Sequence, residues 1–314
     1  MKKERKSLQA IICIMMIFVM AMSMVSCSGN PSENLDKEIE TASEWIKEMT
    51  PAPSTGSIGG EWAVIGLAAS GIPAEENQEY FDLYYDDVRA KTKANKGILD
   101  EKYSTAYARV SLGLAAIGKS PENVEGYNLF EPLDDAEAVT GQGLNAVTFA
   151  LIASNVTGIS LDNEEKYVDL LVDEIETEKL YDDERFVDYV AMCMQGLSYY
   201  MDQEKVNSTV EHCIMGLSAQ QQEDGSFGNC ESTVEVIIGL TAVGIDPVND
   251  QRFTKNGKSL LDGLMEYKED DGYVHINGES SDKFNPLMPT EKALLALDSI
   301  RLFREGKKLY ESER

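Results

Sequence analysis

The sequence predicts an all-α protein, and three observations lead to that class. Apolar residues recur three and four positions apart along nearly the whole chain, which is the period of an amphipathic helix. Alternating strand patterns joined by hairpin turns are missing. Helices rich in Gly and Ala alternate with helices that carry one apolar stripe and an acidic face, which favours an inner ring wrapped by an outer ring. The predicted architecture is a six-fold α/α toroid, with an open helical solenoid as the alternative.

Residues 1–26 have the pattern of an export signal rather than of a folded element. A basic start is followed by an apolar run over 10–22 and by small residues before Cys27. The run is short for a membrane span. This pattern resembles a bacterial lipoprotein signal, with Cys27 as the lipidated residue and 27–34 as a tether. An ordinary signal cut near Ser26, or an uncleaved anchor, would export the protein as well.

About twelve helices in six pairs are expected between residues 35 and 307. They are expected near 35–49, 60–71, 77–95, 103–118, 126–134, 140–155, 164–177, 186–202, 206–221, 231–244, 253–268 and 289–305. The last segment, 308–314, is a short charged tail. Without the signal, about 285 residues remain, which is enough for one large domain with a substantial core.

The second helix of each pair repeats one local feature, a small residue directly before a leucine. The six occurrences are Gly66-Leu67, Gly113-Leu114, Ala150-Leu151, Gly196-Leu197, Gly239-Leu240 and Ala296-Leu297. Successive occurrences are about 37 to 57 residues apart, a spacing typical of helix-pair repeats. These helices are expected to form the inner ring, while the first helices of the pairs carry the acidic faces.

Charge and cysteine content limit the partners and the bonds of the chain. The formal net charge of −27 repels phosphates, so neither nucleic acid nor an anionic lipid surface is an expected partner. Besides Cys27, the chain carries Cys193, Cys213 and Cys230 beyond the signal. An odd number in an exported protein speaks against a disulfide framework, although a bond between Cys213 and Cys230 stays open.

Residues 218–228, SAQQQEDGSFG, form a predicted turn between two helices, with Asp224-Gly225 for the reversal and Phe227 packed back onto the fold. With the following Cys230-Glu-Ser-Thr and apolar Gly-Leu helix, this pattern resembles the prenyltransferase and squalene-cyclase repeat superfamily, the terpenoid cyclase and protein prenyltransferase toroids. Residues 59–67 and 142–145 are similar to exported surface proteins of Gram-positive bacteria within that superfamily. The resemblance covers roughly 35–307. It implies a six-fold α/α toroid at the outer side of a cell membrane.

The catalytic signatures of that superfamily are missing. Triterpene cyclases use an Asp-rich DxDD acid, whereas acidic doublets such as Asp134-Asp135 are expected here at helix ends and turns. Protein prenyltransferases hold zinc with Asp, Cys and His, but this chain has only His212 and His275 and no D-x-C motif. We expect His212 at the surface beside buried thiols; a zinc site of His212 with Cys213 and Cys230 is the alternative. No cofactor or metal is predicted.

The N-terminal ends of the inner helices are expected to converge on a pocket mouth. Taken singly, most of the polar residues there have an ordinary role as helix caps. Taken together, their aromatic, amide and charged groups fit a ligand pocket, in which Trp62 and Tyr107 stack on a ring or sugar face while Arg109 and Glu61 pair or hold a charged group. The predicted mouth consists of Glu61, Trp62, Tyr107, Arg109, Gln142, Asn145, Asp188, Tyr189, Glu231, Thr233, Glu235, Thr290 and Glu291.

The predicted function is therefore that of a lipid-anchored surface protein whose toroid binds a small molecule, a peptide or a glycan without catalysis. Its membrane attachment runs through Cys27, and nucleic acid is not among its partners. Two alternatives remain open at this point. One is an enzyme of the terpenoid cyclase or prenyl-transfer type, which needs an acidic cluster or a metal triad in the cavity. The other is a structural scaffold, which predicts a toroid filled by its own side chains.

Overall fold

The computed structural model describes residues 31–56, 58–270, 272–278 and 285–310, so the expected signal and Cys27 lie outside the described residues. The chain divides into two units, Met1–Glu38 and Ile39–Arg314, and helix α2 (Pro31–Met49) runs across the boundary. The other described helices and strands belong to the second unit. Within the described residues, no helix is both long and apolar enough to cross a membrane.

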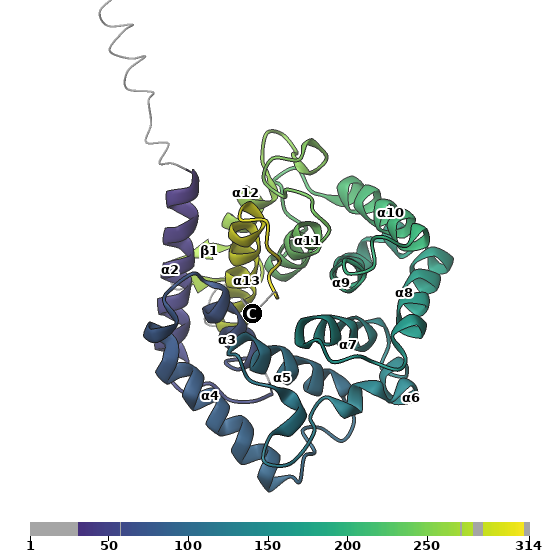
Figure 1. Ribbon diagram of the computed structural model, residues 1–314. Coiled ribbons are helices and arrows are strands. Elements are labelled where there is room, and N and C mark those ends of the chain that lie inside the picture. Colours follow the sequence, from purple (N-terminus) through teal and green to yellow (C-terminus); the bar gives the residue numbers. More distant parts are fainter. Residues whose placement is uncertain (1–30, 57, 271, 279–284, 311–314) are drawn as a thin grey trace, which may run out of the picture. The chain divides into compact units, whose positions relative to one another are not determined.

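Helices dominate the second unit, which confirms the all-α class. Six of the described helices contact one another in a cyclic series: α3 contacts α5, α5 contacts α7, α7 contacts α9, α9 contacts α11, α11 contacts α13, and α13 contacts α3 again. Figure 1 shows these helices around a common centre. Their bounds are Glu61–Ala69 (α3), Ser104–Ala116 (α5), Leu144–Thr157 (α7), Val187–Leu197 (α9), Cys230–Ala242 (α11) and Leu287–Arg304 (α13).

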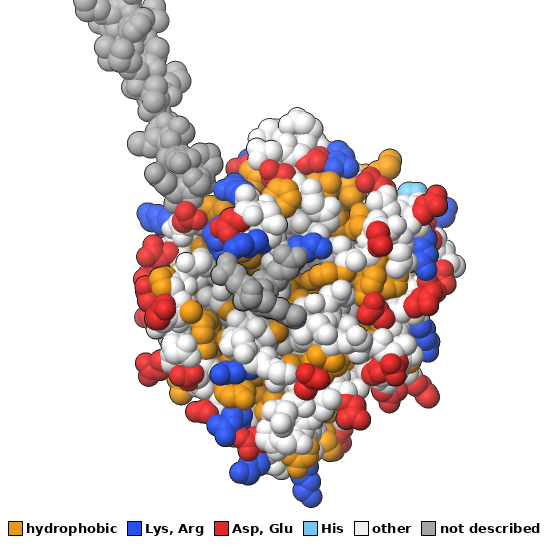
Figure 2. Space-filling model, in the orientation of Figure 1, with side chains coloured by type: hydrophobic (Ala, Val, Ile, Leu, Met, Phe, Trp, Pro, Cys, Tyr) orange, Lys and Arg blue, Asp and Glu red, His pale blue; other side chains and the backbone are white. Residues whose placement is uncertain are grey.

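Amphipathic helices lie outside this series (Figure 1). Helix α4 (Ala74–Ala94) contacts α3, α8 (Glu164–Glu178) contacts α7, and α10 (Glu204–Gln220) contacts α9. The buried residues of α4 follow the helical period, which gives one apolar stripe as the sequence predicts: Asn77, Tyr80, Phe81, Tyr84, Val88 and Thr92. Acidic side chains gather along the edge of the face seen in Figure 2, and hydrophobic ones are exposed nearer its middle.

Short elements connect the long helices. The α-helical ones are α6 (Ala136–Thr140) and α12 (Leu260–Met265). Single 3-10 turns cover Pro121–Asn123, Glu131–Asp134, Leu180–Asp182, Glu184–Phe186 and Gln251–Phe253. Strands β1 (Lys268–Glu269) and β2 (Gly272–Tyr273) pair in antiparallel fashion, and the sequence patterns did not predict them.

The repeated small residue before a leucine lets the inner helices approach closely. A Cβ on Gly239 of α11 would lie 2.7 Å from the carbonyl oxygen of Ala191 in α9, which is closer than a side chain tolerates. A Cβ on Gly196 of α9 would lie 3.2 Å from the Thr148 side chain in α7. The leucines of all six repeats are buried. Gly196 and Gly239 therefore mark contacts between successive inner helices, whereas Gly113 of α5 faces the Tyr84 side chain of the outer helix α4.

Two of the predicted helices are wrong in extent. The segment 126–134 holds a turn and then only a 3-10 turn, because Gly126 adopts φ 89° and starts no helix. The segment 253–268 is helical only in α12, because Gly257 with φ 79° closes a turn first. Helix α12 then begins at Leu260, after the N-cap residue Ser259, whose side chain forms a capping box with Asp262.

The segment 218–228 forms the turn that its composition predicts, between α10 and α11. Gly225 adopts φ 89°, and the amide of Gln222 donates to the carbonyl of Ser226 at 2.9 Å, which closes the reversal. Phe227 is buried, and its amide donates to the Thr233 hydroxyl at 3.0 Å. The Phe227 ring thus packs against the rest of the fold, as the sequence predicts.

The cysteines are buried and unbonded to one another. Cys193, Cys213 and Cys230 are all free, so no bond joins Cys213 to Cys230. Burial raises the pKa of the Cys193 thiol to about 12. His212 is exposed and lies 2.9 Å from the Glu176 carboxylate. The interpretation of a surface histidine beside buried thiols is confirmed.

Candidate functional site

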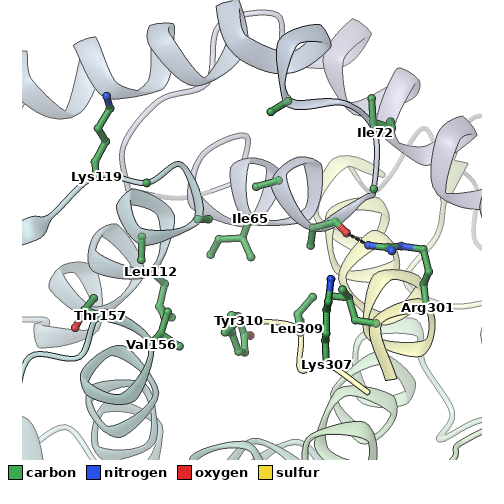
Figure 3. Close-up of a pocket in the computed structure, with 18 of the residues that line it drawn as sticks. Ile65, Ile72, Leu112, Lys119, Val156, Thr157, Arg301, Lys307, Leu309 and Tyr310 are labelled. Carbon is green, nitrogen blue, oxygen red and sulfur yellow. Dashed lines mark hydrogen bonds between the residues drawn. The ribbon is translucent and has the colours of Figure 1, made fainter. Parts of the chain in front are cut away.

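A cavity of about 730 Å³ opens at the C-terminal ends of the inner helices α3, α5, α7 and α13. Figure 3 shows Leu112, Val156 and Thr157 on one side of the cavity, Arg301, Lys307 and Leu309 on the other, and Ile65 and Tyr310 between them. This is the end of the helices opposite to the predicted mouth. The cavity therefore combines the last turns of four helices with the segment that follows α13.

The walls of the cavity are mainly small or apolar, and its charged groups lie on few residues. Small side chains from the last turns of α3 and α5 leave the space open: Ala68, Ala69, Ala115 and Ala116. The cationic lining residues are Lys119, Arg301 and Lys307. Arg301 donates to the carbonyl of Ala69 and lies 2.5 Å from the Glu305 carboxylate (Figure 3). The cavity thus has mainly apolar walls and three cationic side chains among its lining residues.

Residues 307–310 turn from the end of α13 toward the centre of the inner helices (Figure 3). The turn is made by Gly306, which adopts φ 74° two residues after Arg304, the last residue of α13. The amide of Lys307 donates to the carbonyl of Leu302 at 2.9 Å. Leu309 is buried. The hydroxyl of Tyr310 reaches Gln195 in α9 at 3.5 Å. We call residues 307–310 the central tail.

Glu61 and Arg109, two predicted mouth residues, are neighbours. The guanidinium Nε of Arg109 lies 3.8 Å from Oε2 of Glu61. Glu61 is fully buried and also accepts hydrogen bonds from the amide of Gly56 at 2.8 Å and from the hydroxyl of Tyr84 at 3.3 Å. Burial raises the pKa of Glu61. Because Tyr84 belongs to α4, this pair joins the inner helices to an outer one and is not part of the cavity wall.

A second group, which we call the central cluster, consists of Trp62, Phe149, Gln195, Glu235 and Lys292. The Lys292 amine lies 2.9 Å from the Glu235 carboxylate and 4.2 Å from the centroid of the Trp62 ring. Gln195 donates to Glu235 at 2.8 Å, and the rings of Trp62 and Phe149 are 5.5 Å apart. Helices α3 and α7 are not successive in the cyclic series. The Trp62–Phe149 contact therefore crosses the middle of the inner helices.

Four predicted mouth residues instead bind backbone amides of neighbouring segments. Their side-chain oxygens accept from the amides of other residues: Tyr107 from Leu99, Gln142 from Ser104, Thr233 from Phe227, and Thr290 from Tyr273. Tyr107, Thr233 and Thr290 are buried, so they have no free surface for a ligand. Their geometry is that of caps and loop anchors, the ordinary role expected of each one singly.

The remaining mouth residues apart from Glu291 lie on three inner helices. Asp188 is half-buried, and burial raises its pKa. Tyr189 is 43% exposed and contacts the Phe186 ring. Glu231 lies 2.6 Å from Nδ1 of His275, and Asn145 is half-buried. The charges of Glu235 and Glu231 also raise the pKa of Asp188, whereas Lys292 lowers it, so Asp188 lies near Glu231 and the central cluster.

Glu291 is a buried acid whose pKa predicts a pH effect on stability. Its carboxylate accepts from the amide of Gly59 at 2.6 Å, while burial and the nearby Glu61 raise its pKa to about 8. The folded protein then binds a proton more tightly than the unfolded chain. Stability is therefore present at acidic pH and is lost as pH rises from about 4.5 to about 8, at no more than about 1.4 kcal/mol per pH unit for one proton.

The measurement is urea unfolding of the wild type and of Glu291→Gln at several pH values across that range. The neutral amide removes the titration, so the unfolding free energy of the wild type should fall relative to the variant with rising pH. Parallel curves would mean that Glu291 is ionised in the folded protein throughout, and would refute the prediction.

The polar residues of the sequence predict a pocket at the N-terminal ends of the inner helices, whereas the cavity lies at the C-terminal ends of four of them. The cavity is lined by alanines and by loop residues such as Gly71 and Lys119, which carry no motif. The sequence carries one signal for the central tail: Leu309 and Tyr310 are two large apolar residues within 308–314, the predicted charged tail. Such residues indicate a segment that packs rather than one that is solvated.

Comparisons with known proteins add no relative. No protein-family profile matches the sequence, and a search of curated proteins finds no match. The resemblance of 218–228 to the toroid superfamily therefore stays a prediction.

Proposed function

We propose that the protein is an exported, lipid-anchored surface protein whose helices form a six-fold α/α toroid that binds a ligand at its centre. The cyclic contacts of α3, α5, α7, α9, α11 and α13, with amphipathic helices outside them, support the toroid. The pattern of residues 1–26 supports export, and Cys27 is the residue that would carry the lipid. The cell surface of a Gram-positive bacterium is the proposed location.

The observation that carries the binding function is the cavity at the centre of the inner helices. Its volume of about 730 Å³ lies within the range of small-molecule sites, roughly 300 to 1,000 Å³. Apolar walls supply burial for a ligand, and Lys119, Arg301 and Lys307 supply orientation at the border. A structural scaffold has no use for such a space, because side chains of a purely structural core fill it. The ligand is a small molecule, a peptide or a glycan.

The distribution of acids favours binding over catalysis. A cyclase-type reaction needs a protonated acid beside its substrate. Glu61 and Glu291 are buried acids with raised pKa values, but neither is a lining residue of the cavity. Glu305 is the one carboxylate among the described lining residues, and it is exposed and paired with Arg301. Exposure to water and pairing with Arg301 do not suit an acid that must protonate a substrate in a dry cavity.

A ligand screen tests this proposal. Native mass spectrometry and thermal unfolding of the full-length protein are measured with prenyl diphosphates, corrinoids, glycans and peptides. Ala69→Trp and Ala116→Trp place an indole in the cavity, whereas Ala90→Trp adds the same group at an exposed position of α4. A ligand at about 100 times its Kd stabilises the folded state by about 2.7 kcal/mol.

The expected result is stabilisation of the wild type and of Ala90→Trp, with no stabilisation of the two cavity variants. Equal stabilisation of all four proteins would place the ligand elsewhere and overturn the proposal. Turnover of a prenyl diphosphate, lost in Ala69→Trp, would establish the enzyme in its place.

A further inference from the structure

We propose that the space along α9 and α11 that the central tail occupies is a peptide-binding site, and that the tail is its intramolecular occupant. This inference rests on the proposed ligand-binding function of the centre and names the class of ligand: an extended peptide with a lysine, an aliphatic residue and a tyrosine in succession. The tail supplies these as Lys308, Leu309 and Tyr310.

Lys308 is held at the C-terminal end of α9. Its amine donates to the backbone carbonyl of Ser198 at 3.1 Å and to the Ser198 hydroxyl at 3.3 Å. It also lies 4.5 Å from the centroid of the Tyr199 ring. Ser198 directly follows the last residue of α9, where unpaired carbonyls and the negative end of the helix dipole favour a cation. This position therefore selects a basic side chain.

Leu309 and Tyr310 fill the next two positions with different chemistry. Leu309 is 7% exposed. It lines both the large cavity and a smaller pocket formed by residues of α9 and α11. Tyr310 reaches Gln195, which in turn donates to Glu235 in the central cluster. The site therefore suits an aliphatic residue, which packs on its apolar wall, followed by a tyrosine, whose hydroxyl donates to the amide oxygen of Gln195.

The tail is placed so that a ligand can compete with it. Leu309 and Tyr310 form part of the wall of the open 730 Å³ cavity, so a molecule in the cavity touches the tail directly. The tail directly follows the Gly306 turn, which keeps its local concentration at the site high, on the order of millimolar for a short connection. A peptide from another molecule must overcome that concentration. Weakening the tail should therefore strengthen binding of the free peptide.

The probe is a fluorescently labelled, capped peptide of residues 306–310, Gly-Lys-Lys-Leu-Tyr, measured by anisotropy against the full-length protein. The test variant is Leu309→Ser/Tyr310→Ala. Its matched control is Leu83→Ser/Tyr103→Ala, which makes the same two changes at side chains that are 43% and 58% exposed. The peptide carries two positive charges and the protein has a net charge of −27, so the two attract each other without specific contacts. A scrambled peptide of equal composition controls for this attraction.

We expect the test variant to bind the peptide about tenfold more tightly than the wild type and the control do, because its site is no longer occupied. Adding Tyr199→Ala to the test variant should weaken binding again, and the scrambled peptide should bind none of them specifically. If the test variant does not melt cooperatively, Lys308→Met replaces it, since that change removes the contacts of the Lys308 amine with Ser198 and Tyr199.

Equal affinity of all variants for the peptide, or equal binding of the scrambled peptide, would overturn the inference. So would the absence of peptide binding to the test variant. The outcome is separable from that of the ligand screen. A small molecule that stabilises the wild type but not Ala69→Trp would leave the proposed binding function intact while the peptide inference fails.

Discussion

Replacing Lys292 by methionine is expected to destabilise the protein by about 3 kcal/mol, the cost of leaving a buried charge without its partner. The side chains of Lys292 and Glu235 are only 13% and 8% exposed, so water compensates little of the charge that remains on Glu235. The amide of Gln195 is left as the main hydrogen-bond donor to that carboxylate. Urea unfolding at neutral pH measures the loss.

Two matched variants decide whether the missing charge is the cause. Lys292→Met combined with Glu235→Gln removes both charges, and we expect it to recover most of the loss. Lys258→Met breaks an ion pair to Glu266 whose side chains are 45% and 39% exposed, and little change is expected there because water screens the pair. If Lys292→Met matched the wild type, Glu235 would have to be solvated, and the central cluster would not be a dry part of the fold.

Replacing Gly263 by alanine is expected to destabilise the protein by about 3 kcal/mol through overpacking. Gly263 lies in α12 and is buried. A Cβ there would lie 2.4 Å from the carbonyl carbon of Gly225 and 2.5 Å from the amide nitrogen of Ser226. These are backbone atoms of the turn 218–228, so no side-chain rotation relieves the contact. Thermal and urea unfolding measure the effect.

Gly118→Ala is the control for this prediction. Gly118 adopts φ 70° with open space around it, so alanine there costs only the strain of the left-handed conformation, about 1 kcal/mol. A loss for Gly263→Ala no larger than that of Gly118→Ala would mean that α12 can move away from the turn. The close packing of α12 against 218–228 would then contribute little to stability.

The helical class and the division into inner and outer helices could be read from the sequence because both follow from local composition. Gly239 and its neighbours in α11 are nearly all buried, whereas α4 buries one stripe, as the two patterns require. The errors in 126–134 and 253–268 have a local cause as well. Each contains a glycine with positive φ, and the turn at that glycine interrupts the helix that the apolar spacing predicts.

The site could be predicted only in part. Helix ends can be located from a sequence, and Glu61 and Arg109 were expected to pair or hold a charged group; the structure brings them within 3.8 Å. Which end of the inner helices stays open depends on how far side chains from different helices fill the space. That is a sum over many contacts distant in the sequence, so no single motif encodes it.

By itself, therefore, the sequence determined the all-α class, the helix-pair repeat, the buried thiols and the turn at 218–228, because each depends on residues close together in the chain. Only the tertiary structure decided that Lys292 pairs with Glu235 under Trp62, that the cavity opens at the C-terminal helix ends, and that Tyr310 reaches Gln195. These contacts join residues up to 230 positions apart, as in Lys292 with Trp62. Their existence depends on which helix faces meet, and local patterns carry no information about that.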